Sequence, residues 1–380
     1  MIVLYVFMLL ALFYGVLMGI YRYGWDHLKE YDPDLQHAHE DVHVSVIIPA
    51  RNEAAHIQSC LHAICRQHYP PDKMEILVMD DDSTDDTAQR VREIKDPRIR
   101  LLHVSDYVSH ESRQRAPKKK AIELGVAHAH GELIITTDAD CIAELDWIKT
   151  IVSFYRQYHA VCMAAPVIYA NEKSFFDIFQ SLDFMTMQGI TAATDHLKIG
   201  TMCNGANLAY SREAFYQVDG FTGIDGLASG DDMLLMYKLY RAYPDRVFYI
   251  KSRKAIVKTT PVNGLKAFWH QRVRWASKAG KFDDKRLTWV LAGVYCWNLA
   301  FCVLFFAGFF HARWWLWALG LLLYKTVVEL CFLIPVAAFF QKKHLLWYFL
   351  PGQFLHIPYI VSTGLWSLWS RYQWKDRKLK

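Results

Sequence analysis

Two strongly apolar ends flank a mixed central region, and this segregation limits the folds that are open to the chain. Residues 1–20 carry no charged side chain, and the chain becomes apolar and aromatic again from Leu287 onward. A helix needs about 20 apolar residues to cross a bilayer. Residues 1–21 therefore predict an N-terminal transmembrane helix rather than a cleaved signal peptide, which would need a basic start and a small-residue cleavage site.

A C-terminal membrane region is expected over residues 287–370. Two spans are predicted, at about 287–310 and 314–340. The segment 345–370 is interrupted by two prolines and a glycine, so a kinked span, a re-entrant hairpin and an interfacial helix all remain open. Together with the N-terminal helix, this region provides too few membrane spans for one copy of the chain to form a translocation channel.

Positive charge predicts the orientation in the membrane, because basic loops stay on the cytoplasmic side. Arg22 and Lys29 follow the first span, Lys342 and Lys343 follow the third, and a basic tail occupies residues 371–380. All of these lie inside if 345–370 does not cross fully. We therefore expect a multi-pass protein of the inner (cytoplasmic) membrane with its soluble domain in the cytoplasm.

One pair of charges interrupts the third predicted span. Lys325 and Glu329 lie four residues apart, which places them on the same face of a helix. Charges inside a membrane are costly unless they neutralise one another. The spacing favours a self-neutralised pair on a face turned toward protein over a transport path.

The central region, residues 42–282, alternates strand and helix patterns and follows a linker at 22–41. Alternation of this kind predicts an α/β domain with a mainly parallel sheet flanked by helices. Thr84 or Asp85 is expected to cap the second helix. Strands are expected at 42–49, 75–80, 99–104, 133–137, 161–168 and 208–210, and helices at 53–67, 84–95, 119–130, 175–194 and 233–243.

Three acidic clusters follow apolar runs in this region: Asp80-Asp81-Asp82, Asp138-Ala139-Asp140 and Asp231-Asp232. Ligands of open α/β sheets bind at the carboxyl ends of the strands. Two like charges at roughly 4 Å cost about 4 kcal/mol at an effective dielectric constant of about 20. Convergence of these clusters therefore predicts a divalent metal and a phosphorylated substrate.

Several other classes of protein are disfavoured. The net charge of +5 is too modest to predict nucleic-acid binding. No glycine-rich phosphate loop is present. The eight cysteines form no C-x-x-C pair, so they are expected to be reduced thiols.

The chain resembles the inverting family 2 glycosyltransferases with a GT-A fold, including the membrane-bound members that carry a Gln-x-x-Arg-Trp block. The resemblance covers residues 42–281. It rests on a series of blocks whose order and spacing are specific: VSVIIPARNEAAHI, EILVMDDDSTDDT, PKKKAIELGV, GELIITTDADC, NGANLAYSREAFYQVDGF, GDDMLLMYKL and QRVRW.

The resemblance implies a donor site for a nucleotide-diphosphate sugar, with a UDP-sugar favoured. Glu53 and Asp81 match positions that contact the uracil and ribose, and Pro49 belongs to the same block. Lys118 and Lys119 match a lysine block near the base and phosphates, although either one could instead belong to a solvated basic face.

The D-x-D pair, Asp138 and Asp140, is implied to reach the ribose and a divalent ion. Two residues apart on an extended segment, the two side chains share one side. Asp140 is favoured as the metal ligand. Mg²⁺ or Mn²⁺ fits hard oxygen ligands and a diphosphate.

Asp232 matches the general base that deprotonates the acceptor hydroxyl. The family usually has Glu before this residue, and Asp231 stands here instead. That departure leaves open which carboxylate is the base. Gly205, Ala206 and Asn207 are implied to contact the acceptor.

Gln271, Arg274 and Trp275 match the block that closes over the diphosphate and the acceptor. Arg274 can offset charge on the leaving group, and Trp275 offers a face on which a sugar can stack. The same residues also fit a membrane-surface helix with basic and aromatic side chains.

The sequence therefore predicts a metal-dependent, inverting hexosyltransferase that glycosylates a membrane lipid or lipid-linked acceptor. A processive polysaccharide synthase, similar to those that make cellulose, chitin or hyaluronan, is the alternative. A non-catalytic nucleotide-sugar-binding scaffold is a third class, which the presence of every acidic motif disfavours. The donor sugar, the acceptor and the oligomeric state are not predicted.

Overall fold

The computed structural model divides by its contacts into two compact units. The sheet unit comprises Lys29–Ala170, Thr201–Thr260 and Gln373–Lys380, and the helical unit comprises Met1–Leu28, Asn171–Gly200 and Pro261–Tyr372. The expected linear domain boundaries, including the linker and the basic tail, stay predictions. The described residues are 2–33, 41–200, 202–226, 230–277, 285–367, 372–374 and 377–379.

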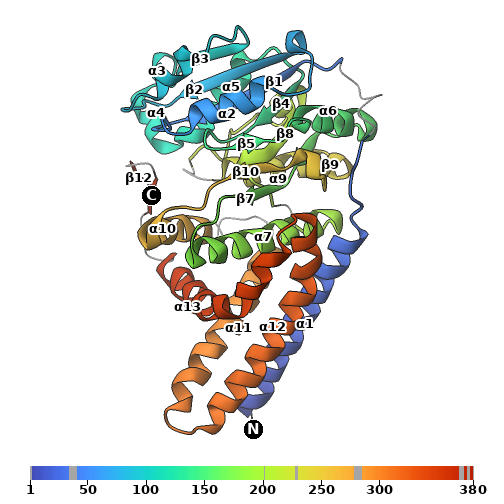
Figure 1. The fold of residues 1–380 in the computed structure, drawn as a ribbon, viewed down its shortest axis with the longest axis vertical. Helices are drawn as coiled ribbons and strands as arrows, with labels where there is room; N and C mark the ends of the chain where they lie inside the picture. The colour runs from blue at the N-terminus through green and yellow to red at the C-terminus, as the bar shows by residue number, and fades with distance from the viewer. Residues whose placement is uncertain are drawn as a thin grey trace. The chain divides into compact units, whose positions relative to one another are not determined.

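A seven-stranded sheet with the order β3-β2-β1-β4-β8-β6-β9 forms the core of the sheet unit (Figure 1). Its parallel pairs are β1 with β2, β1 with β4, β2 with β3 and β6 with β9, while β8 runs antiparallel to both neighbours. This confirms the mainly parallel sheet. The strands are β1 (Val44–Ala50), β2 (Met74–Asp80), β3 (Ile99–His103), β4 (Leu133–Thr136), β6 (Cys162–Ala164), β8 (Leu208–Ser211) and β9 (Val247–Tyr249).

The single strand expected at 161–168 is wrong, because this segment contributes to two sheets. β6 ends at Ala164 in the large sheet, and β7 (Val167–Tyr169) joins a three-stranded sheet with β10 (Val257–Thr259) and β5 (Ile142–Ala143). Pro166 lies between the two strands and has no N–H to donate to a ladder. The Pro166 carbonyl accepts the Val257 N–H at 3.0 Å, and this hydrogen bond connects the segment to β10 of the smaller sheet.

Helices flank the sheet, and α5 packs against β1 and β2. Gly125 makes this close packing feasible, because a Cβ there would lie 2.7 Å from a methyl group of Ile47. The helices of the sheet unit are α2 (Ile57–Cys65), α3 (Thr87–Glu93), α4 (His110–Arg115), α5 (Pro117–His128), α6 (Trp147–Tyr158), α8 (Arg212–Gln217) and α9 (Asp231–Ala242).

The start of α3 differs from the expected cap at Thr84 or Asp85. The helix begins at Thr87, its N-cap is Asp86, and the Asp86 side chain makes no capping hydrogen bond. The Asp85 carboxylate instead accepts the N–H groups of Thr87 and Ala54, both at 3.0 Å. Asp85 therefore joins two loops rather than extending the helix backward.

The helical unit contains α1 (Ile2–His27), α7 (Phe175–His196), α10 (Gly264–Ala276), α11 (Lys285–Gly308), α12 (Arg313–Phe339) and α13 (Phe349–Ser367). In Figure 1, α1, α11 and α12 run side by side, as their mutual contacts require. Three segments are long and apolar enough to cross a membrane: Leu4–His27, Arg286–Gly308 and Arg313–Phe339. They confirm one N-terminal and two C-terminal candidate spans, while the depth of η7 (Lys343–Tyr348) and α13 stays a prediction.

The long helix expected at 175–194 is confirmed as α7. Ser174 accepts the Asp177 N–H at 3.1 Å, and Asp177 accepts the Ser174 N–H at 3.0 Å, which is a capping box. Gly189 lets α12 approach closely, because a Cβ there would lie 2.8 Å from Val336. By its contacts, α7 belongs with α1 and α12 in the helical unit.

The expected neutralised pair in α12 is confirmed and extends to α13. The Lys325 ammonium donates to Glu329 Oε1 and to Gln353 Oε1, each at 2.6 Å, and Gln353 Nε2 donates to Glu329 Oε2 at 2.6 Å. The Tyr14 hydroxyl on α1 also donates to Glu329. Lys325 is fully buried, so the charges face protein. We call Lys325, Glu329 and Gln353 the polar ring.

Candidate active site

Strand direction gathers the candidate residues at one edge of the large sheet. The parallel strands β1, β2 and β4 end there at Ala50, Asp80 and Thr136. β8 runs the other way, and its first residue, Leu208, pairs with Thr136. The short 3-10 helix η3 (Gly205–Asn207) therefore reaches the same edge.

A lysine joins two of the three acidic clusters. Lys118, in the first turn of α5, donates from Nζ to Asp138 Oδ1 at 2.7 Å and lies 3.4 Å from Asp231 Oδ2. Burial disfavours its charge, but the charges of Asp138, Asp231 and Asp232 outweigh burial and raise the pKa of Lys118 above its ordinary value. A protein ammonium thus offsets part of the repulsion that was expected to require a metal.

The acidic pair occupies the first turn of α9. Gly230 precedes it with a φ of +84°, a conformation that glycine adopts without strain. The helix N-terminus favours negative charge. Asp232 Oδ2 accepts the Gly205 N–H at 3.1 Å, and Asp232 Oδ1 accepts the Met233 N–H at 2.8 Å. These bonds fix the orientation of the Asp232 carboxylate.

Crowding around position 205 favours glycine there. A Cβ there would lie 3.1 Å from Lys118 Nζ and 3.2 Å from Asp231 Oδ2. The Gly205 carbonyl accepts the Thr136 hydroxyl at 3.1 Å, so η3 is tied to the end of β4. Gly205 thus brings the backbone of η3 close to both acidic clusters.

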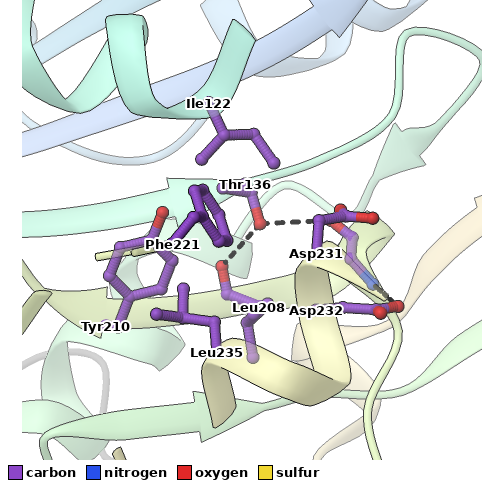
Figure 2. A pocket seen from close by; sticks show the side chains of 9 residues that line it. Ile122, Thr136, Leu208, Tyr210, Phe221, Asp231, Asp232 and Leu235 are labelled. Atoms are coloured by element: carbon purple, nitrogen blue, oxygen red, sulfur yellow. Dashed lines mark hydrogen bonds between the residues drawn. The ribbon is translucent and has the colours of Figure 1, made fainter. Parts of the chain in front are cut away.

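Figure 2 shows a small hollow beside the acidic pair, with Asp231 and Asp232 on one side and Phe221, Tyr210 and Leu235 among the residues facing them. The hollow leaves essentially no room for a water molecule. Ligand pockets usually measure about 300–1,000 Å³, so it is too small for a nucleotide sugar. It provides Asp231 with a mostly apolar backing.

Asp140 differs from Asp138 in its partners. It accepts the Thr259 hydroxyl at 3.1 Å and the Cys141 thiol at 3.6 Å, and in the described part of the chain no ion pair joins it to a Lys, Arg or His. Burial and the nearby charge of Asp138 raise the pKa of the Asp140 carboxyl. A divalent cation would relieve both effects, so the donor set fits a metal.

The protein supplies few ligands for such a metal. Among the described residues, no group of three or more His, Cys, Asp or Glu side chains is arranged to hold an ion. Mg²⁺ is commonly held by one or two carboxylates together with substrate phosphates and water. The arrangement around Asp140 therefore fits an ion that arrives with a diphosphate.

The first acidic cluster has its own basic partners, which the sequence did not reveal. His103 Nδ1 lies 3.0 Å from Asp80 Oδ2, and Arg113 pairs with Asp82. Arg51 Nη1 donates to the carbonyls of Asp81 and Asp82 at 2.5 and 2.8 Å. No spacing rule links these residues, because each contact is made between separate elements.

Other candidate donor residues lie near this edge in different environments. Pro49 lies in β1 opposite Met79. The Glu53 N–H donates to Thr87 Oγ1 at 2.7 Å. Lys119 is 1% exposed and donates to the Ile224 carbonyl at 2.6 Å, so it ties α5 to a loop rather than facing a solvated surface.

The Asn207 side chain has a structural role, because its amide is hydrogen-bonded to other parts of the protein. Its Oδ1 accepts the Trp147 indole N–H at 2.9 Å, and its Nδ2 donates to the carbonyls of Pro166 and Ala255 at 2.9 and 2.8 Å. The side chain is fully buried and joins the large and small sheets. Ala206 is also buried, and its contact with an acceptor stays a prediction.

The Gln271, Arg274 and Trp275 block lies on α10 in the helical unit. Its placement over the diphosphate stays a prediction. Arg272, which the motif does not single out, is 3% exposed and lies 2.8 Å from Asp183 Oδ2 on α7.

Arg272 is also held by aromatic rings. Its guanidinium lies 4.8 Å from the ring centroid of Phe268 and 4.3 Å from that of Trp275. Asp183 in turn accepts the Tyr359 hydroxyl of α13 at 2.7 Å. The pair therefore fastens α10 to α7 and α13, and it orients Trp275.

Comparison with known families agrees with this fold. The family model "Glycosyl transferase family group 2" matches residues 133–355, more than half of the chain, and "Glycosyl transferase family 2" matches residues 45–219. The chain belongs to the family 2 glycosyltransferases.

Its sequence relatives are distant. The probable glycosyltransferase YdaM of Bacillus subtilis is 26% identical over 269 residues, which cover 68% of this chain and 61% of the relative. The 4,4'-diaponeurosporenoate glycosyltransferase of Staphylococcus aureus is 27% identical over 213 residues, covering 53% of this chain and 54% of the relative. The chain thus spans only about 61% and 54% of these two proteins.

A solved structure matches almost the whole chain. The mannosyltransferase of Pyrobaculum calidifontis, in complex with GDP-mannose and Mn²⁺, aligns over 97% of both chains with a TM-score of 0.56 and 20% identity. At this identity the match shows the fold, and it agrees with the GT-A fold expected from the sequence.

Proposed function

We propose that the protein transfers a sugar, with inversion, from a nucleotide-diphosphate sugar to a hydroxyl of a membrane lipid or lipid-linked acceptor. The main observation in support of this function is the convergence of Asp138, Lys118, Asp231 and Asp232 at the carboxyl edge of the sheet. The apolar helices of the same chain support a membrane acceptor. The Staphylococcus relative, named for 4,4'-diaponeurosporenoate, also favours a lipid-related acceptor.

Asp232 is the proposed general base. Its carboxylate is held by two backbone N–H groups, from Gly205 and Met233. It takes the proton of the acceptor hydroxyl while that oxygen bonds to the anomeric carbon and the bond from that carbon to the diphosphate oxygen breaks. One base and one displacement give an inverted linkage without a covalent enzyme intermediate.

Asp140, with Asp138 beside it, is proposed to hold Mg²⁺ or Mn²⁺. The ion would offset the charge of the diphosphate as it leaves. Asp140 suits this role because its described partners are neutral and its carboxylate is otherwise costly to keep charged. The family likeness adds Arg274 as a further cation for the leaving group and Glu53 and Asp81 as contacts for the nucleoside.

The topology of the proposal follows the charge pattern of the sequence. The sheet unit would lie in the cytoplasm, with residues 345–370 in or re-entering the inner leaflet. η7 and α13 occupy this stretch as a short 3-10 helix followed by a helix with an internal proline, Pro358. Such a broken segment suits the bilayer interface better than a straight crossing.

Incubation of membranes with a panel of radiolabelled UDP- and GDP-sugars tests the proposal. A lipid-soluble labelled product that is absent with Asp232→Asn membranes is expected, and NMR should show a β-linkage from an α-linked donor. Label that appears only in polymer would favour the processive synthase instead. A retained α-linkage would contradict the inverting mechanism.

A further inference from the structure

The acidic constellation contains two parts. One part has the Lys118 ammonium as its partner, and the other part, at Asp140, has neutral hydrogen-bond donors. Lys118 lies between Asp138 and Asp231, at 2.7 and 3.4 Å from their nearest oxygens. Asp140 instead accepts hydrogen bonds from a hydroxyl and a thiol, both of which are neutral. Lys118 therefore already offsets part of the negative charge on the side of the acidic pair.

The position of the Lys118 ammonium is fixed by its surroundings. Its side chain is 19% exposed, and the Asp231 side chain is 10% exposed. Pro117 begins α5 immediately before it, and proline at the first position sets the entry into a helix. The Gly205 backbone also crowds the ammonium, because a Cβ on Gly205 would lie 3.1 Å from Lys118 Nζ.

A divalent ion and an ammonium compete for the same carboxylate oxygens. Their like charges repel most strongly at short distance and in a partly buried site. A carboxylate that binds a metal directly is also a poor proton acceptor, because the ion holds its lone pairs. An enzyme that places a metal-binding pair beside a basic carboxylate must keep the two roles apart.

We propose that Lys118 is a positioning residue that excludes the divalent ion from the Asp231–Asp232 pair and thereby confines it to Asp140. This rests on the proposed function, which assigns the ion to Asp140 and proton transfer to Asp232. The lysine acts as a cation that belongs to the protein and therefore stays next to the acidic pair. Asp138 is shared, because its Oδ1 accepts from Lys118 and its negative charge also acts on Asp140.

Binding of Mn²⁺ alone, followed by electron paramagnetic resonance of the full-length protein in detergent, tests this without catalysis. The wild-type protein should bind one ion, which Asp140→Asn should remove. Lys118→Met, which keeps the length of the side chain without its charge, should bind a second ion or bind Mn²⁺ about tenfold more tightly. Lys118→Arg keeps the charge and should resemble the wild type.

Two further variants locate the effect and guard against a folding defect. Lys118→Met combined with Asp231→Asn should lose the additional binding. If Lys118→Met is less stable, Mn²⁺ should raise its unfolding temperature more than that of the wild type, because the ion replaces the missing cation. A larger shift supports the inference even where the variant folds poorly.

The outcomes separate the inference from the proposed function. Unchanged stoichiometry and affinity in Lys118→Met, with no additional stabilisation by Mn²⁺, overturn the role of Lys118. Failure of the wild type to bind Mn²⁺ would contradict the metal assignment at Asp140. In that case Mn²⁺ binding that appears in Lys118→Met still shows that the lysine excludes ions. If Lys118→Met also fails to bind Mn²⁺, the role of Lys118 is rejected.

Discussion

Replacement of Asp183 by Asn should destabilise the helical unit strongly. The Asp183 and Arg272 side chains are 7% and 3% exposed, and the guanidinium lies 2.8 Å from the carboxylate. The amide would keep the shape of the side chain while it leaves a buried guanidinium without its counter-ion. Removal of one partner from a buried ion pair costs about 3–5 kcal/mol.

The loss can be measured as a fall in the unfolding temperature of the detergent-solubilised protein. About 3–5 kcal/mol corresponds to a fall of roughly 4–6 °C in a chain of 380 residues. Thr186→Ala is the matched control on α7, because the Thr186 hydroxyl returns only to the Leu182 carbonyl of its own helix, at 2.8 Å. The control should change stability by less than about 0.5 kcal/mol.

A double variant separates charge from packing. Asp183→Leu with Arg272→Met replaces the pair by apolar side chains, which often restores stability when a buried pair is exchanged as a whole. Activity should remain low in the double variant, because the Arg272 guanidinium also holds the ring of Trp275. Equal stability of Asp183→Asn and the wild type would refute the reasoning, since the pair would then not be buried and coupled.

Three further predictions concern the proposed chemistry and topology. Asp232→Asn should lower transfer by about 10²–10⁴-fold with donor binding retained in calorimetry; an active Asp232→Asn beside a dead Asp231→Asn would identify Asp231 as the base. Mn²⁺ affinity should fall as pH is lowered, and the fall should begin at a higher pH than an ordinary aspartate would give, because the raised pKa of Asp140 leaves it protonated sooner; a pH-independent affinity between pH 4 and 7 would contradict its role as ligand. A cysteine introduced into residues 371–380 should resist an impermeant thiol reagent in intact cells, and labelling from outside would show that 345–370 crosses the bilayer.

Much of the fold followed from local patterns. The apolar runs before the first two acidic clusters became the strands β2 and β4, which end at the site edge. The spacing of Lys325 and Glu329 predicted their pair correctly, because it is a contact within one helix. Local periodicity did not reveal Gln353, which meets that pair from a different helix.

The parts that were missed depend on contacts between distant residues. Lys118 meets Asp231 through a contact between α5 and α9, which are distant in the chain, and nothing in the lysine block indicates this. The division of residues 161–168 into two strands at Pro166 likewise could not be predicted without the partner strand β10. The residues on both sides of Pro166 have the composition of a strand. Within QRVRW, the buried arginine is Arg272, and its pairing depends on Asp183, which lies on another helix.

The polar ring has a consequence for shortened versions of the protein. Gln353 on α13 provides the amide that satisfies both Lys325 and Glu329 inside α12. Deletion of the chain after α12 would leave that ion pair with one partner fewer and uncovered on the side where α13 stood. Truncation at this point, a common route to more tractable membrane enzymes, would therefore yield a less stable protein unless Lys325 and Glu329 were replaced together by apolar residues.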